Sequence, residues 1–312
     1  MIITYFHLIF TFILLNYFFN ISLIFLPISL IFKYLDVYIT KLKIEYPKDK
    51  NVILKNNLYI KRALYFYNKN KKKEKNIIPL NVYQTYKTVE LPKTMKEAHN
   101  ILKKQNPEFK FHLYDDNMCR EFIKKHFDKD VLFAFDNLIP GAYKADLWRY
   151  CLLYINGGIY VDIKFIIDKS CPIKFIDLIN EEYLVRDISS DDKGEYIYQG
   201  FIVSKPKNII LKKCIEKLVY NVKNQIYTTS CLGITGPKLV SEICNEYIRY
   251  LDGNLVSLSV KKLDNNLNYA IFFEDKIFLT KLNPYIYQKE LETNYSKLWK
   301  SKDVFKNNIK YN

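Results

Sequence analysis

The amino-acid sequence predicts an α/β fold for residues 76–312, and three observations support this prediction. Short runs rich in β-branched and aromatic residues alternate with longer stretches that have helical spacing. Gly157 and Gly158 separate one helical stretch from the next strand, and glycine is the residue that helix C-termini prefer. That strand is almost wholly apolar, as expected for a strand covered on both faces. Strands separated by helices favour a sheet with largely parallel pairing.

The first predicted elements follow from local patterns. The run at 77–86 is short and rich in strand-forming residues, and Pro92 is a favourable first residue for a helix that we expect to end near Gln105. The apolar residues at 109, 111 and 113 alternate with polar ones, which predicts a half-buried strand. Asp115 and Asp116 end this strand, because aspartate favours turns.

The later elements continue the alternation. We expect helices at 117–127, 142–154, 208–222 and 237–251, and strands at 159–165, 196–203, 269–273 and 276–279.

Asp162 is the first candidate site residue, because ligands of such sheets bind at the carboxyl ends of the strands. A carboxylate there could hold sugar or ribose hydroxyls or a divalent cation. Taken alone, Asp162 could equally be a turn residue that ends its strand.

The N-terminal stretch predicts a membrane anchor. Residues 1–32 contain no Asp, Glu, Lys or Arg and are mostly apolar. About 20 such residues suffice to cross a bilayer, so we predict an uncleaved, single-pass transmembrane helix. A cleaved signal peptide would need a positive start and a small-residue exit, which this stretch lacks. Asn16, Asn20 and Pro27 interrupt the run, which leaves a buried core helix as the alternative.

Residues 33–75 form a predicted basic linker or stem between the anchor and the domain at 76–312. They hold 13 Lys and Arg against 4 Asp and Glu, and so carry nine of the fifteen net positive charges. Like charges resist compaction, which favours a solvated linker, and contact with anionic lipid heads is the second interpretation. The same charges would keep the following chain in the cytoplasm by the positive-inside tendency.

The composition excludes several classes of protein. With 49% hydrophobic and 26% charged residues, the chain is not of the disordered type. The six cysteines are scattered without a CxxC spacing, which argues against a disulfide framework and a structural zinc site. No nucleic-acid partner is expected, because most of the positive charge lies in the leader and no known binding module is present.

Three segments together resemble one family of glycosyltransferases. Residues 78–87 resemble its opening segment, I-P-K-x-I-H-Q-T-W. Residues 106–116 resemble its next segment, N-P-x-Y-x-x-x-L-W-D-D, which ends in two aspartates. Residues 145–162 resemble its most specific run, A-D-x-x-R-Y-x-x-L-Y-x-x-G-G-x-Y-x-D. Residues 200–201 and 235–237 show a weaker similarity to the same family. The chain is thus similar to glycosyltransferase family 32, whose sugar-binding region contains a DXD motif.

The resemblance implies a GT-A fold, a Rossmann-like α/β unit with a mixed sheet. It also implies transfer of a sugar from a nucleotide-sugar, UDP- or GDP-linked, to a glycan or other hydroxyl acceptor with retention at the anomeric carbon. By family analogy the enzyme would act in the Golgi lumen, in contrast to the cytoplasmic side favoured by the charge of the linker. The side of the membrane therefore stays open.

The resemblance also implies the roles of individual residues. Asp146, Arg149 and Asp162 would bind the donor and take part in catalysis, and Val82 and Gln84 would border the nucleotide. Asp146 and Arg149 stand at i and i+3, so one helix face can present both to one ligand. A plain intrahelical ion pair is the alternative for these two residues.

Two departures from the family pattern affect the predicted metal site. The DXD motif reads Asp162-Ile163-Lys164, so an ammonium replaces the second carboxylate. A Mn or Mg ion could then be held by Asp162 and Asp168, or Lys164 could itself face the donor diphosphate as a point charge, or Lys164 could point away. The second departure concerns a His that many members of the family have near a Trp close to the C-terminus. In this chain no His follows His126, and only the aromatic residue, Trp299, is present there.

Two function classes therefore remain open. The first is an active glycosyltransferase. The second is a catalytically silent membrane protein that binds a sugar-nucleotide or glycan, in which Lys164 marks a lost active site.

Overall fold

The computed structural model describes residues 78–187, 196–246, 258–262, 269–273, 276–282 and 295–306. The predicted anchor at 1–32 and the basic linker at 33–75 lie outside these residues, so both remain predictions. Within the described ranges, no helix has the length and apolar character needed to span a membrane.

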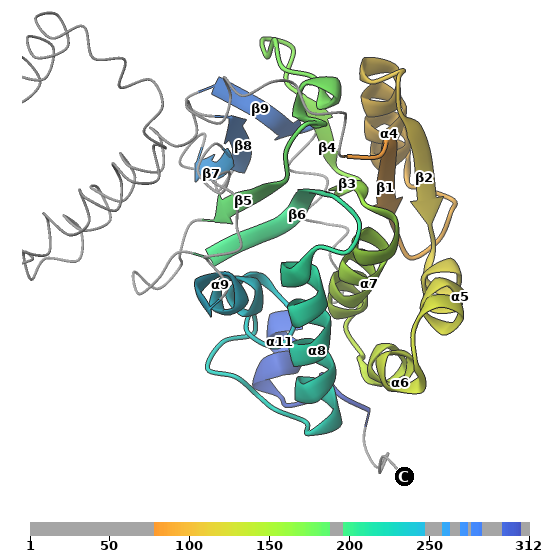
Figure 1. Ribbon diagram of the computed structural model, residues 1–312, viewed down its shortest axis with the longest axis vertical. Coiled ribbons are helices and arrows are strands. Elements are labelled where there is room, and N and C mark those ends of the chain that lie inside the picture. The colour runs from red at the N-terminus through yellow and green to blue at the C-terminus, as the bar shows by residue number, and fades with distance from the viewer. Residues whose placement is uncertain are drawn as a thin grey trace, which may run out of the picture. The chain divides into compact units, whose positions relative to one another are not determined.

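The described strands form one nine-stranded sheet in the order β2-β1-β3-β6-β5-β7-β8-β9-β4 (Figure 1). The strands are β1 Asn81–Thr85, β2 Lys110–Tyr114, β3 Gly158–Val161, β4 Phe165–Ile167, β5 Tyr183–Asp187, β6 Tyr196–Ser204, β7 Leu258–Lys262, β8 Tyr269–Phe273 and β9 Lys276–Lys281.

The sheet is mixed rather than largely parallel. Strand β1 runs parallel to β2 and to β3, and β5 runs parallel to β7. The other five pairings of described strands are antiparallel. The α/β class is therefore confirmed, and the expected parallel pairing is wrong. The reason lies in the connections: β5 and β6, β7 and β8, and β8 and β9 are consecutive strands joined by at most eight residues, which is too short for the crossover that a parallel return needs. Between β4 and β5 lies the short helix η2 (Phe175–Leu178).

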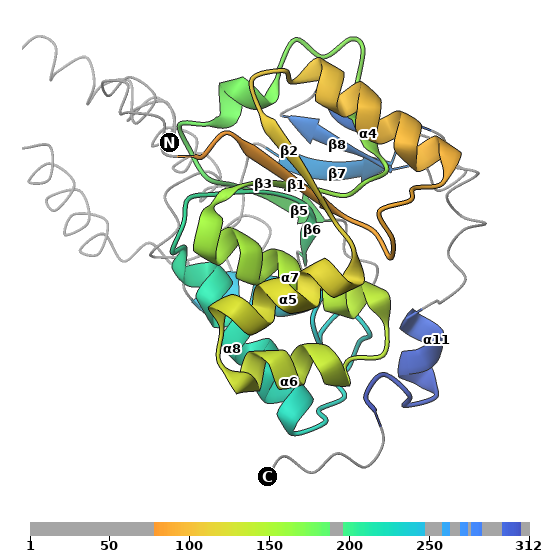
Figure 2. The ribbon, with the colours of Figure 1, turned by 90° about the vertical axis from the view of Figure 1, so that its right-hand side faces the viewer.

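Helices cover both faces of this sheet. They are α4 Lys93–Gln105, α5 Asp116–His126, α6 Lys129–Asn137, α7 Gly141–Asn156, α8 Ile209–Lys223, α9 Pro237–Glu246 and α11 Tyr295–Lys300. Figure 2 shows α5, α6, α7 and α8 on one side of β1, β3 and β6, with α4 on the other side.

Alternating side chains of the central strands divide the buried residues into two cores. Tyr160 and Ile202 point to the core that is built with α5 to α9. Val161 and Phe201, their chain neighbours, point to the core shared with η2, β4 and β7 to β9. All four residues of β3 are buried, as the apolar run predicts.

The Gly157–Gly158 dipeptide joins α7 to β3 at a close approach of three segments. Both glycines have positive φ values, +62° and +105°. A Cβ atom on Gly158 would lie 2.7 Å from the carbonyl oxygen of Asn81 in β1, and one on Gly157 would lie 2.6 Å from Cδ of Pro206. The predicted helix stop is confirmed, and the dipeptide lets β3 enter directly beside β1.

The predicted strand at 159–165 is interrupted by a turn. Strand β3 ends at Val161, and the N–H of Phe165 donates to the carbonyl oxygen of Asp162 at 3.1 Å before β4 begins. An apolar run does not reveal this break, although aspartate favours it. Asp162 and Lys164 therefore lie in a turn between two strands and not within the sheet.

Candidate functional site

Asp162 stands at the carboxyl end of β3, in the turn before β4. Its N–H donates to the carbonyl oxygen of Gly200 in β6 at 2.8 Å. The hydroxyl of Tyr160 donates to Oδ1 at 2.9 Å, and the hydroxyl of Tyr198 lies 3.4 Å from Oδ2. Nζ of Lys164 is 2.8 Å from Oδ2. The carboxylate therefore has donors on both oxygens.

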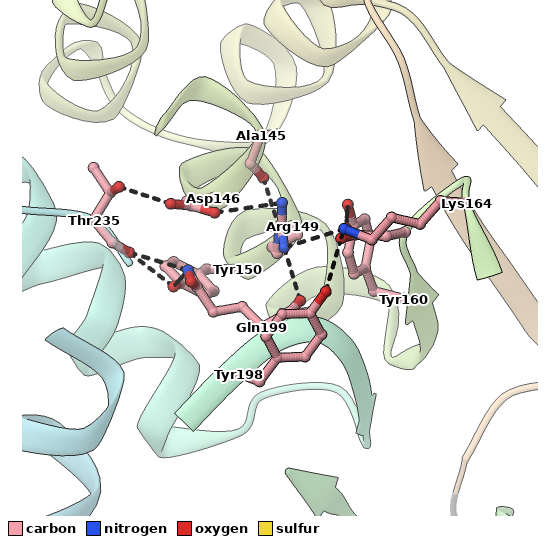
Figure 3. A network of polar contacts seen from close by, with 10 residues as sticks. Ala145, Asp146, Arg149, Tyr150, Tyr160, Lys164, Tyr198, Gln199 and Thr235 are labelled. Atoms are coloured by element: carbon pink, nitrogen blue, oxygen red, sulfur yellow. Dashed lines mark hydrogen bonds and ion pairs between the residues drawn. The ribbon is translucent and has the colours of Figure 1, made fainter. Parts of the chain in front are cut away.

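Helix α7 presents Arg149 to this carboxylate. Its Nη1 lies 3.6 Å from Oδ1 of Asp162 and donates to the carbonyl oxygen of Gln199 at 2.8 Å. Its Nε donates to the carbonyl oxygen of Ala145 at 3.2 Å, and its guanidinium carbon stands 4.3 Å from the ring centroid of Tyr160. Figure 3 shows the hydrogen bonds and ion pairs of Arg149 converging on its guanidinium group. Arg149 is thus fixed by the helix, by β6 and by an aromatic face.

Asp146 lies one helical turn before Arg149, as the i, i+3 spacing predicts. Nη2 of Arg149 is 3.3 Å from Oδ1 of Asp146, and the hydroxyl of Thr235 donates to Oδ2 at 2.7 Å. The carbonyl oxygen of Thr235 accepts from the hydroxyl of Tyr150 at 2.8 Å (Figure 3). Both members of the pair are buried, and their network joins α7 to β6 and to the loop before α9.

The two carboxyl groups of this network have opposite pKa shifts. Burial raises the pKa of Asp146 to about 7, and the charge of Arg149 and the hydrogen bond from Thr235 only partly oppose that rise. Burial also acts to raise the pKa of Asp162, but the charges of Lys164 and Arg149 outweigh it and bring the value down to about 2. Burial acts to lower the pKa of Arg149, yet Tyr160, Asp146 and Asp162 together raise it. At neutral pH Asp162 is therefore an anion, whereas burial favours the protonated form of Asp146.

The donor set at this turn does not fit a divalent cation. Lys164 occupies the position of the second DXD carboxylate, and its ammonium is already bonded to Asp162. A hard cation seeks several oxygen ligands of negative charge, whereas here it would meet an ammonium and a guanidinium. In the described ranges no three His, Cys, Asp or Glu side chains are grouped so that they could hold a metal ion.

Asp168, the second predicted metal ligand, lies at the far end of β4 from Lys164. A strand of this length spans about 10 Å. Oδ1 of Asp168 accepts hydrogen bonds from the backbone N–H and the hydroxyl of Ser170, at 2.9 and 2.5 Å. The structure places Asp168 in a local turn and does not bring it to Asp162.

The predicted nucleotide-binding residues, Val82 and Gln84, point to the α4 face of β1. The side chain of Val82 is fully buried in the core on that face. Gln84 is also fully buried, with Oε1 2.6 Å from Nδ1 of His99 in α4. Its Nε2 atom is buried without a hydrogen-bond partner among the described residues. The role of these two residues in donor binding stays a prediction, and His99 is a partner that no sequence pattern marked.

Several aromatic and polar partners of the site were not predicted as site residues: Tyr160, Tyr198, Gln199, Thr235 and Tyr295. Gly200 shows how one of them is accommodated, since its own Cβ would fall 2.5 Å from the ring of Tyr198. The absence of a side chain lets that ring lie beside Asp162. Tyr160 stands in the specific run at 145–162, and the weaker similarities at 200–201 and 235–237 were the available signal for the partners in β6 and in the loop before α9.

Tyr295 packs the C-terminal helix α11 against helix α7, which carries Asp146 and Arg149. Its ring lies 5.7 Å from that of Tyr143, between centroids. Burial raises the pKa of Tyr295 to about 12, with smaller contributions from Cys231 and Asp146 that raise it further and one from Lys164 that lowers it. The helix therefore lies within the electrostatic reach of Asp146 and Lys164.

Comparison with known proteins identifies the segment that carries this site. Residues 92–185 match the family described as glycosyltransferase sugar-binding region containing DXD motif. This stretch contains Asp146, Arg149 and Asp162, and the resemblance drawn from the sequence is confirmed.

Individual relatives agree with this match. A mannosyl phosphorylinositol ceramide synthase of Saccharomyces cerevisiae is 29% identical over 180 residues, which cover 56% of this chain and 44% of that protein. Inositol phosphoceramide mannosyltransferase 2 of Schizosaccharomyces pombe is 29% identical over 177 residues, which cover 56% and 48%. The chain thus spans about half the length of these relatives. Among solved structures, PaToxG glycosyltransferase has a TM-score of 0.45 at 16% identity and covers 61% of this chain and 80% of that one.

Proposed function

We propose that this chain, whose residues 92–185 match the DXD-containing sugar-binding region, is a glycosyltransferase with a GT-A fold. It would transfer a sugar from a nucleotide-sugar donor to a hydroxyl of a glycan or another acceptor, with retention at the anomeric carbon. The observation that carries the proposal is the buried network of Asp146, Arg149 and Asp162 at the carboxyl end of β3. That end of an α/β sheet is where ligands bind.

The chemistry of the network suits this reaction. Asp162 stays ionised and is an acceptor that can bind ribose and sugar hydroxyls. Arg149 is a permanent cation that can form forked hydrogen bonds with phosphate oxygens. Negative charge grows on the departing nucleoside diphosphate in the transition state, so a fixed guanidinium beside it lowers the barrier. Asp146 positions Arg149 for this task through their contact at 3.3 Å.

The donor is proposed as a UDP- or GDP-linked sugar. Mannose is the first sugar to test, because the names of the two yeast relatives describe mannosyl transfer. No metal ion enters the proposed chemistry, since the donor set around Asp162 does not fit one. Membrane attachment through residues 1–32 belongs to the same proposal and rests on their lack of charged side chains.

A silent binding protein is the second candidate. The contact between Lys164 and Asp162 at 2.8 Å favours it, because this lysine engages the carboxylate that would otherwise face the donor.

Release of nucleoside diphosphate separates the two candidates. Full-length chain in detergent is incubated with a panel of UDP- and GDP-sugars, with GDP-mannose included, and the released diphosphate is measured. We expect release from at least one donor, and we expect it to fall strongly in Asp162→Asn. The control is Asp303→Asn, which removes the same charge from an exposed site. Saturable donor binding with no release by the parent protein would support the silent binder instead.

Membrane attachment is tested separately by sedimentation. The full-length protein should pellet with membranes, and deletion of residues 1–32 should leave it in the supernatant with donor hydrolysis preserved. Recovery of the full-length protein in the soluble fraction without detergent would refute the anchor.

A further inference from the structure

The turn from β3 to β4 gathers basic groups where the family pattern has carboxylates. Lys164 is largely buried, with 13% of its side chain exposed, and its ammonium is 2.8 Å from Oδ2 of Asp162. The same ammonium lies 5.3 Å from the ring centroid of Phe165 and 6.0 Å from that of Tyr198. These contacts fix the ammonium in the site, so Lys164 does not point away from it.

A second lysine flanks this turn. Lys281, the last residue of β9, pairs with Phe165 at the start of β4. The next residue, Leu282, donates its N–H to the carbonyl oxygen of Lys164 at 3.3 Å. Burial lowers the pKa of Lys281, the charge of Lys164 lowers it further, and Asp162 opposes the change. The two ammonium groups and the carboxylate are therefore electrostatically coupled.

The ammonium of Lys164 places a positive charge beside Asp162, at the position that holds the second carboxylate in an intact DXD site. There, a cation bound to carboxylates neutralises the diphosphate as it departs. A lysine ammonium carries three N–H donors, so it can bond a carboxylate and a phosphate oxygen at the same time. It supplies a compact positive charge that needs no second carboxylate to hold it.

On the basis of the proposed function, we infer that Lys164, bonded to Asp162 and assisted by Lys281, binds the diphosphate of the donor in place of a divalent cation. The site then binds nucleoside diphosphate without added metal. Lys164 acts on the diphosphate and not on the base or the ribose.

Calorimetry with the full-length chain in detergent tests this inference. UDP and GDP are titrated in EDTA and again with Mn²⁺. We expect affinity for the preferred nucleotide to agree within about twofold between the two conditions. Lys164→Gln should weaken binding about 10- to 100-fold in EDTA, the range for one charge-assisted hydrogen bond, and Mn²⁺ should not restore it. Lys281→Gln should cause a smaller loss.

Three comparisons separate this role from a merely structural one. Lys164→Arg keeps the charge and should retain most of the affinity. Lys164→Gln should leave the much weaker binding of the corresponding nucleoside unchanged. Lys276→Gln removes a charge from the exposed start of the same strand as Lys281 and should stay within twofold of the parent.

The failures are distinguishable. Binding of the parent protein that vanishes in EDTA and returns with Mn²⁺ would overturn this inference and leave the glycosyltransferase proposal intact. The absence of any nucleoside diphosphate binding, with or without Mn²⁺, would overturn both.

Discussion

Two acid–base pairs build the site, and they differ in what surrounds them. Asp146 and Arg149 form a pair inside helix α7, where every charged group also contacts β6 or the loop before α9. Asp162 and Lys164 form a pair across a turn, with 20% and 13% of their side chains exposed. The helical pair holds elements together and meets the strand end through Arg149 alone, whereas both members of the turn pair lie at the strand end.

The pairs also differ in how many cations face each carboxylate. Asp162 is in contact with both Lys164 and Arg149, and its pKa falls to about 2. Asp146 has Arg149 and a neutral hydroxyl, which do not offset its burial, and its pKa rises to about 7. The pKa values of the two aspartates therefore shift in opposite directions, because two cations outweigh the cost of burial at Asp162 and one cation does not at Asp146.

The largest effect should come from Arg149→Met. This change leaves Asp146 and Asp162 buried without their shared cation, and breaking a buried pair costs about 3–5 kcal/mol. We expect the free energy of unfolding in urea to drop by that amount and transfer to be lost. Asp146→Asn combined with Arg149→Met should be less destabilised than Arg149→Met alone, because one buried charge is removed together with its partner.

Arg120→Met is the matched control for this comparison. Arg120 forms a surface pair with Asp136 through two contacts of 2.7 Å. Its loss should change stability far less, because solvent screens exposed pairs. Equal destabilisation by the two Arg→Met changes would show that the helical pair is not the anchor of the network.

Asp162→Asn should have the second-largest effect, and it should lower activity by a larger factor than it lowers stability. The change removes a charged acceptor, which is worth about 1.5–3 kcal/mol, so initial rates of donor turnover should fall at least about tenfold. Asp146→Asn keeps Asp162 ionised and should cost less turnover. Activity of Asp162→Asn within twofold of the parent would show that the turn pair does not face the donor.

The two aspartates should give opposite pH dependences of stability. The folded-state pKa of Asp162 lies below its ordinary value of 3.8, so its contribution is full above about pH 4 and is lost as the pH falls towards 2. The folded-state pKa of Asp146 lies above that value, so its contribution is full below about pH 4 and is lost as the pH rises through 7.

Thermal unfolding of the two Asn variants between pH 3 and pH 8 measures these slopes. Relative to the parent, Asp146→Asn should gain stability as the pH rises, by at most about 1.4 kcal/mol per pH unit. Asp162→Asn should lose stability relative to the parent as the pH rises from 3 to about 4, because the parent gains the contribution of the ionised carboxylate over that range. Parallel curves for the two variants would contradict the difference between the pairs.

The sequence was sufficient for the elements with strong periodicity and for the two acidic positions. The helix at 92–105 and the strand at 269–273 appear as α4 and β8 within one residue, because apolar spacing and Pro92 decide them locally. It was not sufficient for α6, which follows α5 closely, or for β5 and β7, whose pairing is tertiary. The i, i+3 spacing predicted that Asp146 and Arg149 lie together, and the family resemblance predicted that Asp162 shares their site, whereas the direction of Lys164 depended on a turn that an apolar run conceals.

The smallest predicted effect concerns the hydrogen bond that Thr235 donates to Asp146. Thr235→Val removes this hydroxyl and keeps the backbone oxygen that accepts from Tyr150. The loss of one hydrogen bond should cost about 1 kcal/mol of unfolding free energy. The hydroxyl stabilises the ionised form of Asp146, so its removal should raise the pKa of Asp146 further, and the acid limb of the pH–turnover profile should shift to higher pH. The shift should be absent when Thr235→Val is made in the Asp146→Asn background. A pH profile that Thr235→Val leaves unchanged would mean that Asp146 does not set the acid limb, and that the helical pair serves folding alone.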